Sequence, residues 1–152
     1  MKRTRAILFT FILSGMLLAA CGGKESATAG HHHGAASERY ETTASVSEMP
    51  KFLSSYTDNT QATYATVGEL EDIIKEIKCY CGCMDEETGY HDSLHRCFIA
   101  ENKDGEVKWT DHGAQCGICL TELQDAKRLH DEGKSVDEIK QFIDNKYKGT
   151  ES

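Results

Sequence analysis

The sequence predicts a small, mainly α-helical domain with an irregular centre rich in cysteine and histidine and a short β-hairpin. Apolar residues recur at helical spacing in three segments of the 152-residue chain. Six cysteines and three histidines lie in the span that begins at Cys79 and ends at Cys119. A turn-forming tetrapeptide separates two short strand-like segments. The length allows one domain once the two ends are set aside.

The N-terminal segment has the pattern of a bacterial export signal. Basic residues precede an apolar run at 6–18, which is shorter than the roughly 20 residues of a membrane-spanning helix. The sequence LAAC at 18–21 follows this run, resembles a lipobox and ends in Cys21. We expect a signal peptide at 1–20 and a diacylglycerol on the Cys21 sulfur, which would anchor the chain to the outer face of the cell membrane. The alternative is an ordinary signal peptide followed by a chance cysteine.

Composition divides the remaining chain and excludes one class of partner. Gly, Ala, Ser, Thr and Glu dominate 21–47, which predicts a flexible tether, whereas 48–149 forms the domain and 150–152 a disordered tail. The net charge is −8, and loss of the basic signal peptide makes the chain more acidic still. Such a chain should not bind nucleic acid.

Three helices and one hairpin follow in order. A capping-box pattern at 66–69 opens an apolar stripe that runs into Cys79. The turn 102–105 lies between strand-like residues 98–100 and 107–109. A second helix is expected at 115–132, ended by a glycine, and a second capping box at 135–138 opens the third helix.

The run CYCGC holds Cys79, Cys81 and Cys83 at alternate positions. In an extended strand their side chains would be about 6.6 Å apart, too far for one tetrahedral ion with bonds of about 2.3 Å. The segment must therefore curl, and Gly82 supplies the backbone freedom. Disulfides between neighbours in CxC are strained, so a disulfide framework would need partners elsewhere.

The second group of donors is His112, Cys116 and Cys119. If a helix begins before His112, the three side chains share one helical face. If it begins later, Cys116 and Cys119 form a CxxC at a helix N-terminus, where the macrodipole favours thiolate for metal binding or for redox chemistry. The spacing leaves both arrangements open.

A third group holds His91, His95 and Cys97, of which His91 and Cys97 are expected ligands. The expected metal set is Cys79, Cys81, Cys83, His91, Cys97, His112, Cys116 and Cys119. Thiolate with imidazole suits Zn²⁺ and Cu⁺ rather than a hard cation. These donors suffice for two four-coordinate ions or for a shared thiolate cluster.

Several of these segments occur together in one family. CYCGC, YHDSLHRCF, WTDH, CGIC and EGKSVDEIKQFIDNKY, in that order, resemble the PCYCGC-motif lipoproteins, which come mostly from Gram-positive bacteria. The resemblance covers the lipobox and most of 49–148. The sequence departs from the family at Lys78, where the name-giving proline would stand. The resemblance implies no particular activity.

We therefore expect a membrane-tethered, non-catalytic lipoprotein that binds Cu⁺ or Zn²⁺ through thiolates and imidazole. Two alternatives remain. Six cysteines besides Cys21 is an even number, which allows a disulfide-stapled adaptor. A thiol–disulfide oxidoreductase would use the pair Cys116 and Cys119.

Overall fold

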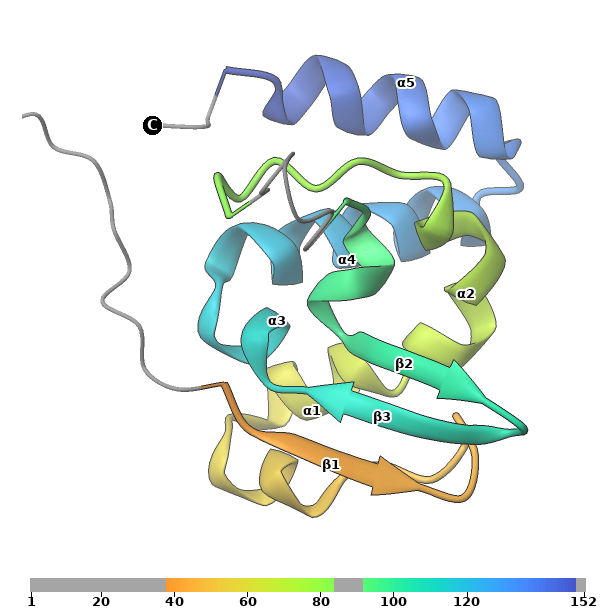
Figure 1. Cartoon of the computed structure of the whole chain (residues 1–152). Helices are drawn as coiled ribbons and strands as arrows, with labels where there is room; N and C mark the ends of the chain where they lie inside the picture. The colour runs from red at the N-terminus through yellow and green to blue at the C-terminus, as the bar shows by residue number, and fades with distance from the viewer. Residues whose placement is uncertain (1–37, 84–91, 150–152) are drawn as a thin grey trace, which may run out of the picture.

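A computed structural model describes residues 38–83 and 92–149. Within them, a three-stranded antiparallel sheet has the order β1-β3-β2, and α5 lies at the opposite end of the domain from β1, with α4 between them (Figure 1). The elements are β1 (Tyr40–Thr43), the 3-10 helix η1 (Lys51–Ser55), α1 (Asp58–Tyr64), α2 (Val67–Lys75), the 3-10 helix η2 (Leu94–Cys97), β2 (Ile99–Lys103), β3 (Glu106–Thr110), α3 (His112–Gln115), α4 (Gly117–Asp131) and α5 (Val136–Tyr147). The mainly α-helical class predicted from the sequence is confirmed.

The predicted hairpin is β2 and β3, which pair in antiparallel register. Its turn uses two residues in the left-handed region, Asp104 at φ 54° and Gly105 at φ 90°. This is the backbone that a tight hairpin turn requires, because it matches the twist of the two strands. The hairpin leads directly into α3. Only Asp111 separates the end of β3 at Thr110 from His112, the first residue of α3.

The first strand corrects the predicted boundary of the tether. Tyr40–Thr43 lies inside the segment 21–47, yet it pairs with β3 along its whole length. The hydroxyl of Thr43 accepts a hydrogen bond from Trp109 Nε1 at 2.8 Å, and Trp109 is fully buried. The edge of a two-stranded hairpin leaves backbone groups unpaired, and β1 satisfies them on one side.

The helices follow the predicted pattern with two corrections. Thr66 does not cap α2: it is helical itself and its hydroxyl donates to the carbonyl of Thr63, because α1 ends just before it. The helix predicted at 115–132 is α4, which begins two residues later than predicted because the backbone at Cys116 is extended, with φ −110° and ψ 110°. The capping box of α5 at Ser135 is confirmed, as is the glycine that ends α4, Gly133, at φ 76°.

The core is continuous from the sheet to α5. Tyr64, Phe98 and Trp109 are fully buried, and the rings of Tyr64 and Phe98 meet edge to face with centroids 5.0 Å apart. The hydroxyl of Tyr64 donates to the carbonyl of Thr110 and accepts from the amide of Ala114. These bonds tie α1 to the last residue of β3 and to α3. No helix among the described residues combines the length and hydropathy of a membrane span.

Candidate metal centre

The CYCGC segment curls between α4 and α5 (Figure 1). Tyr80 anchors the segment to both helices. Its amide donates to Glu122 Oε1 in α4 at 2.8 Å, and its hydroxyl donates to Asp144 Oδ1 in α5 at 2.8 Å. Gly82 has φ 75°, which turns the chain sharply after Cys81. The predicted curl is therefore present, and it directs Cys79 and Cys81 into the domain.

The second group enters from the break between α3 and α4. Cys116 is the N-cap residue of α4, and Cys119 lies in the first turn, so the later helix start is the one adopted. His112 is the first residue of α3. Gly113, beside it, is pressed so closely on Phe98 that a β-carbon there would lie 2.5 Å from the ring. The short helix thus rests on the core and holds His112 and Cys116 at fixed positions.

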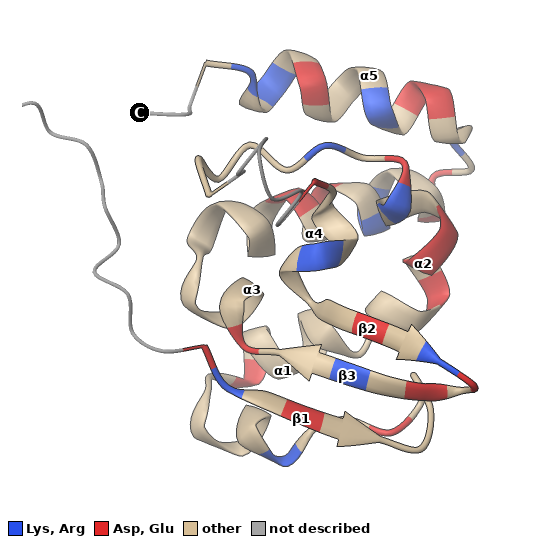
Figure 2. Cartoon of the chain, viewed as in Figure 1, with Lys and Arg blue, Asp and Glu red and all other residues tan. Residues whose placement is uncertain are grey.

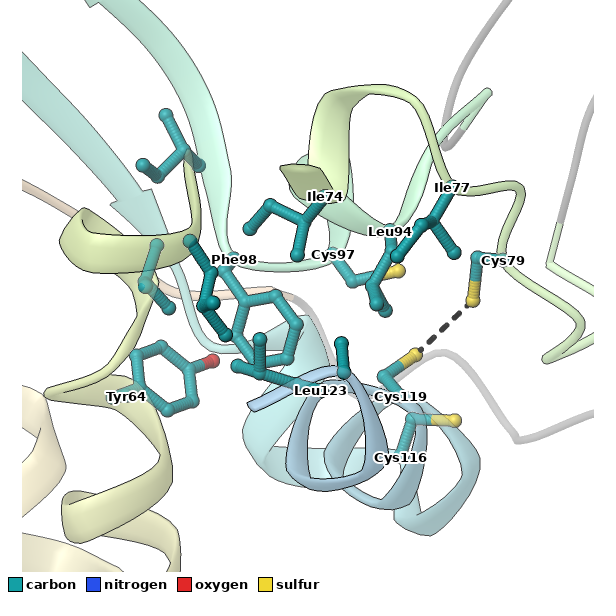
Figure 3. Close-up of a cluster of buried hydrophobic side chains, with 14 of the residues drawn as sticks. Tyr64, Ile74, Ile77, Cys79, Leu94, Cys97, Phe98, Cys116, Cys119 and Leu123 are labelled. Atoms are coloured by element: carbon teal, nitrogen blue, oxygen red, sulfur yellow. Dashed lines mark hydrogen bonds between the residues drawn. The ribbon is translucent and has the colours of Figure 1, made fainter. Parts of the chain in front are cut away.

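Cys97 reaches the same place from η2. It is fully buried, like Cys79 and Cys119, and Figure 3 shows their sulfur atoms beside the apolar side chains that separate the cluster from the sheet. The Sγ atoms of Cys79 and Cys119 lie 3.6 Å apart (Figure 3). Residues from four separate parts of the chain therefore converge on one buried position.

The donor atoms fall into two sets of four, and within each set every pair lies within 4.8 Å. The first set is Cys79, Cys81, Cys97 and Cys119. The second set is Cys81, His112, Cys116 and Cys119. Four cysteines, or three cysteines and one histidine, are ligand sets typical of a tetrahedral metal site. The six residues taken together form what we call the thiol cluster.

His112 is oriented by a carboxylate. Its Nδ1 lies 3.1 Å from Oε1 of Glu38, and its Nε2 points toward Sγ of Cys81 at 4.0 Å. A carboxylate on the far nitrogen is the usual partner of a metal-ligating histidine, because it fixes the ring and makes the ligating nitrogen more basic. Glu38 also accepts from the hydroxyl groups of Tyr40 and Thr110, so its own position is set by the sheet.

The pKa values of the cysteine thiols in the cluster are shifted in different directions. The pKa of Cys81 is lowered because the thiols of Cys116 and Cys119 donate hydrogen bonds to its thiolate. The pKa of Cys119 is raised well above its usual value, since it donates to Cys116 and Cys79 and is buried. For Cys79 a hydrogen bond from Cys119 lowers the pKa, but the one donated to Cys81, with burial, raises it to about 11. Cys79 and Cys119 therefore favour the neutral thiol, and a positive charge among the sulfur atoms would favour their thiolates.

The basic residues next to the cluster in sequence are Lys78, whose Nζ lies 5.4 Å from the centre of the Tyr80 ring, and Arg96, which donates to the carbonyl of Ala100. Segments 79–83 and 112–121 contain no lysine, arginine, aspartate or glutamate, and α3 is uncharged in Figure 2. The buried acidic side chains closest in sequence are Asp111, paired with Arg39 at 2.7 Å, and Glu122. A cation bound among the sulfur atoms is the group that would stabilise several thiolates there.

Not every expected ligand joins the cluster. Cys83 is outside both sets, and its Sγ faces the carbonyl of Cys81 at 3.8 Å, because the turn at Gly82 carries it away. His91 and Cys21 lie outside the described residues. His95 is buried against Glu71 with 3.6 Å between Nε2 and the carboxylate, and it belongs to neither set.

Sequence reasoning missed the residues that support the cluster. Glu38 was assigned to the tether, and it stands 74 positions before His112, so no local spacing connects the two. Glu122 is fully buried one turn after Cys119, and a glutamate on the apolar face of α4 is the signal that could have revealed it.

The cysteines of the described chain are all free thiols. The family model described as "Protein of unknown function with PCYCGC motif" matches residues 9–151. No curated protein and no solved structure matches the chain.

Proposed function

This chain belongs to the family of proteins of unknown function with a PCYCGC motif, and we propose that its thiol cluster binds a soft metal ion, Cu⁺ or Zn²⁺, without catalysing a reaction. Thiolate and imidazole donors prefer these ions over Mg²⁺ or Ca²⁺.

One observation carries the proposal: two sets of four soft donors, each within 4.8 Å, lie in a buried position. In a tetrahedron of bonds of about 2.3 Å, neighbouring sulfur atoms are roughly 3.8 Å apart. The 3.6 Å between Cys79 and Cys119 is close to this value, and the 4.0 Å between Cys81 and His112 needs only a small contraction. Little rearrangement would therefore be needed to admit an ion.

The same geometry supports metal binding over thiol–disulfide exchange. A redox nucleophile is an accessible thiol with a lowered pKa. Cys116 is only 4% exposed. A hydrogen bond from Cys119 lowers its pKa, but the bond that it donates to Cys81, with burial, raises it overall. The donor atoms are also grouped in fours rather than in separate cysteine pairs, which suits a metal ion better than a set of disulfides.

The test is anaerobic purification of the mature chain, followed by elemental analysis and thiol counting before and after a strong chelator. We expect bound Cu⁺ or Zn²⁺ and thiols that become alkylatable once the metal leaves. Cys119→Ser should abolish tight binding, whereas Cys83→Ser, outside both sets, should retain it. A metal-free protein whose cysteines react only after reduction would favour the disulfide alternative.

We further propose that the domain works at the outer face of the bacterial cell membrane, held there by lipid on Cys21. The pattern LAAC after a basic start and a short apolar run supports this placement. The tether is then shorter than the sequence suggests, because the described domain already includes β1.

A further inference from the structure

We infer that the thiol cluster holds two ions rather than one, with the thiolates of Cys81 and Cys119 bridging them. This inference rests on the proposed metal binding and extends it to the number, charge and arrangement of the ions. The first ion would take Cys79 and Cys97 as its own ligands, and the second would take His112 and Cys116.

The overlap of the two sets is the geometric reason. Six donor atoms form two groups of four and not one group of six, and the groups have Cys81 and Cys119 in common. A single tetrahedral ion would leave two of the six donors without a role. Thiolate sulfur has enough lone pairs to bind two ions, so two shared sulfurs complete both tetrahedra.

The two bridging residues come from different parts of the fold. Cys81 belongs to the curled loop before Gly82, and Cys119 to the first turn of α4. Figure 3 shows Cys119 with Cys79 and Cys116 on either side of it. Cys79 and Cys116 belong to different sets, so a central Cys119 is the position expected of a bridge.

Charge selects divalent ions. The cluster contains five cysteines and one histidine, and five thiolates carry five negative charges. With all six residues bound to two ions, two divalent ions would leave one negative charge, whereas two monovalent ions would leave three. Unbalanced charge is costly in a buried position. Two Zn²⁺ ions therefore fit the cluster best.

Native mass spectrometry of the mature chain with Zn²⁺, after anaerobic metal removal, counts the ions. We expect two per chain, and Cys83→Ser should also bind two. Cys79→Ser and Cys116→Ser each remove a ligand of one ion only and should bind one. Cys119→Ser removes a shared ligand and should lose both tightly bound ions.

Cobalt tests the bridge independently, because it replaces Zn²⁺ in tetrahedral sites and is paramagnetic. Two Co²⁺ ions that share thiolates couple magnetically, so the EPR signal per cobalt should be much weaker in the wild-type chain than in Cys79→Ser holding one cobalt. Because this comparison uses only the wild type and Cys79→Ser, it still tests the bridge if Cys119→Ser fails to fold, which loss of its helical circular dichroism would reveal.

The outcomes separate the two proposals. One tightly held ion per chain with each of Zn²⁺, Co²⁺ and Cu⁺, or two Co²⁺ with full uncoupled signals, would overturn the bridged pair while leaving metal binding intact. Two Cu⁺ but only one Zn²⁺ would overturn the choice of divalent ions. No binding of Zn²⁺, Co²⁺ or Cu⁺ would overturn both the inference and the proposed function.

Discussion

The Nδ1 atom of His112 lies 3.1 Å from Oε1 of Glu38, so a residue just before the first strand orients a ligand of the thiol cluster. The other ring nitrogen faces Cys81 at 4.0 Å. The carboxylate is itself held by the hydroxyl groups of Tyr40 and Thr110. Strand β1 and the cluster are therefore parts of one hydrogen-bonded arrangement.

Replacing Glu38 tests this relationship. Glu38→Gln keeps the shape but removes the charge that makes His112 a stronger ligand, and we expect metal affinity to fall about 10- to 100-fold. Competition with a chromophoric chelator measures the affinity. Glu101→Gln, on the exposed end of β2, is the matched control and should bind like the wild type. Equal affinities for both variants would show that Glu38 does not support the site.

Two glycines near the ligands should respond oppositely to alanine. At Gly113 the added carbon would lie 2.5 Å from the ring of Phe98 and 2.9 Å from the carbonyl of Cys97, so α3 must shift. We expect a loss of about 1–3 kcal/mol in unfolding free energy and weaker metal binding. At Gly117 the carbon meets nothing within 4 Å, and alanine should be neutral or stabilise α4 by up to about 1 kcal/mol.

Chemical denaturation of the metal-free proteins, followed by chelator competition, measures both effects. The prediction fails if Gly113→Ala is as stable as Gly117→Ala.

The turn at Gly82 should tolerate asparagine better than valine. Its φ of 75° lies in the left-handed region, where a β-branched side chain clashes with the backbone and asparagine is accepted more readily. No atom lies within 4 Å of an added β-carbon, so the difference reflects backbone strain and not packing. We expect Gly82→Val to weaken metal binding more than Gly82→Asn does. Similar affinities in the two variants would mean that this backbone conformation does not position Cys81.

Asp125 should make stability depend on pH at the contact between α4 and α5. Burial opposes its ionisation, but hydrogen bonds from Lys146 and Tyr147 outweigh burial and hold the pKa of Asp125 below its usual value. A carboxyl whose folded pKa is depressed contributes stability above its unfolded pKa of about 3.9. That contribution is lost as the pH falls through the folded pKa.

Asp125→Asn should therefore cost about 1–2 kcal/mol of unfolding free energy at pH 7 and progressively less as the pH falls below about 4. Urea denaturation across this range measures the difference from the wild type. Asp104→Asn, in the β2–β3 turn, is the control, because asparagine also accepts a positive φ. A cost for Asp125→Asn that stays constant with pH would contradict the ionic role.

Lipid attachment is tested at Cys21. Cys21→Ser removes the sulfur that would carry the diacylglycerol, so we expect the chain to leave the membrane fraction. Fractionation of the bacterial host, with mass analysis of the processed N-terminus, detects the change. Metal binding by the released protein should be unaltered, because the substitution leaves all six residues of the thiol cluster in place. Continued recovery of the variant as a processed, membrane-bound lipoprotein would contradict the lipobox interpretation.

Local patterns were sufficient for the elements whose causes are local. The capping box at Ser135, the glycine that ends α4 and the hairpin turn at 102–105 were each predicted from a few neighbouring residues. The need for CYCGC to curl also followed from bond lengths alone. In these cases the interactions that form the element lie within one or two turns of chain.

Long-range contacts decided the remainder. The sequence by itself determined the mainly helical class, the family and the soft donors. Only the tertiary structure decided that Tyr40–Thr43 joins the sheet, that Cys83 turns away, and that Cys81 and Cys119 are shared by both donor sets. The physical reason is that these outcomes depend on which surfaces meet after folding. The pairing of β1 with β3, the closeness of Gly113 to Phe98 and the contact of Glu38 with His112 all join residues that no sequence period connects.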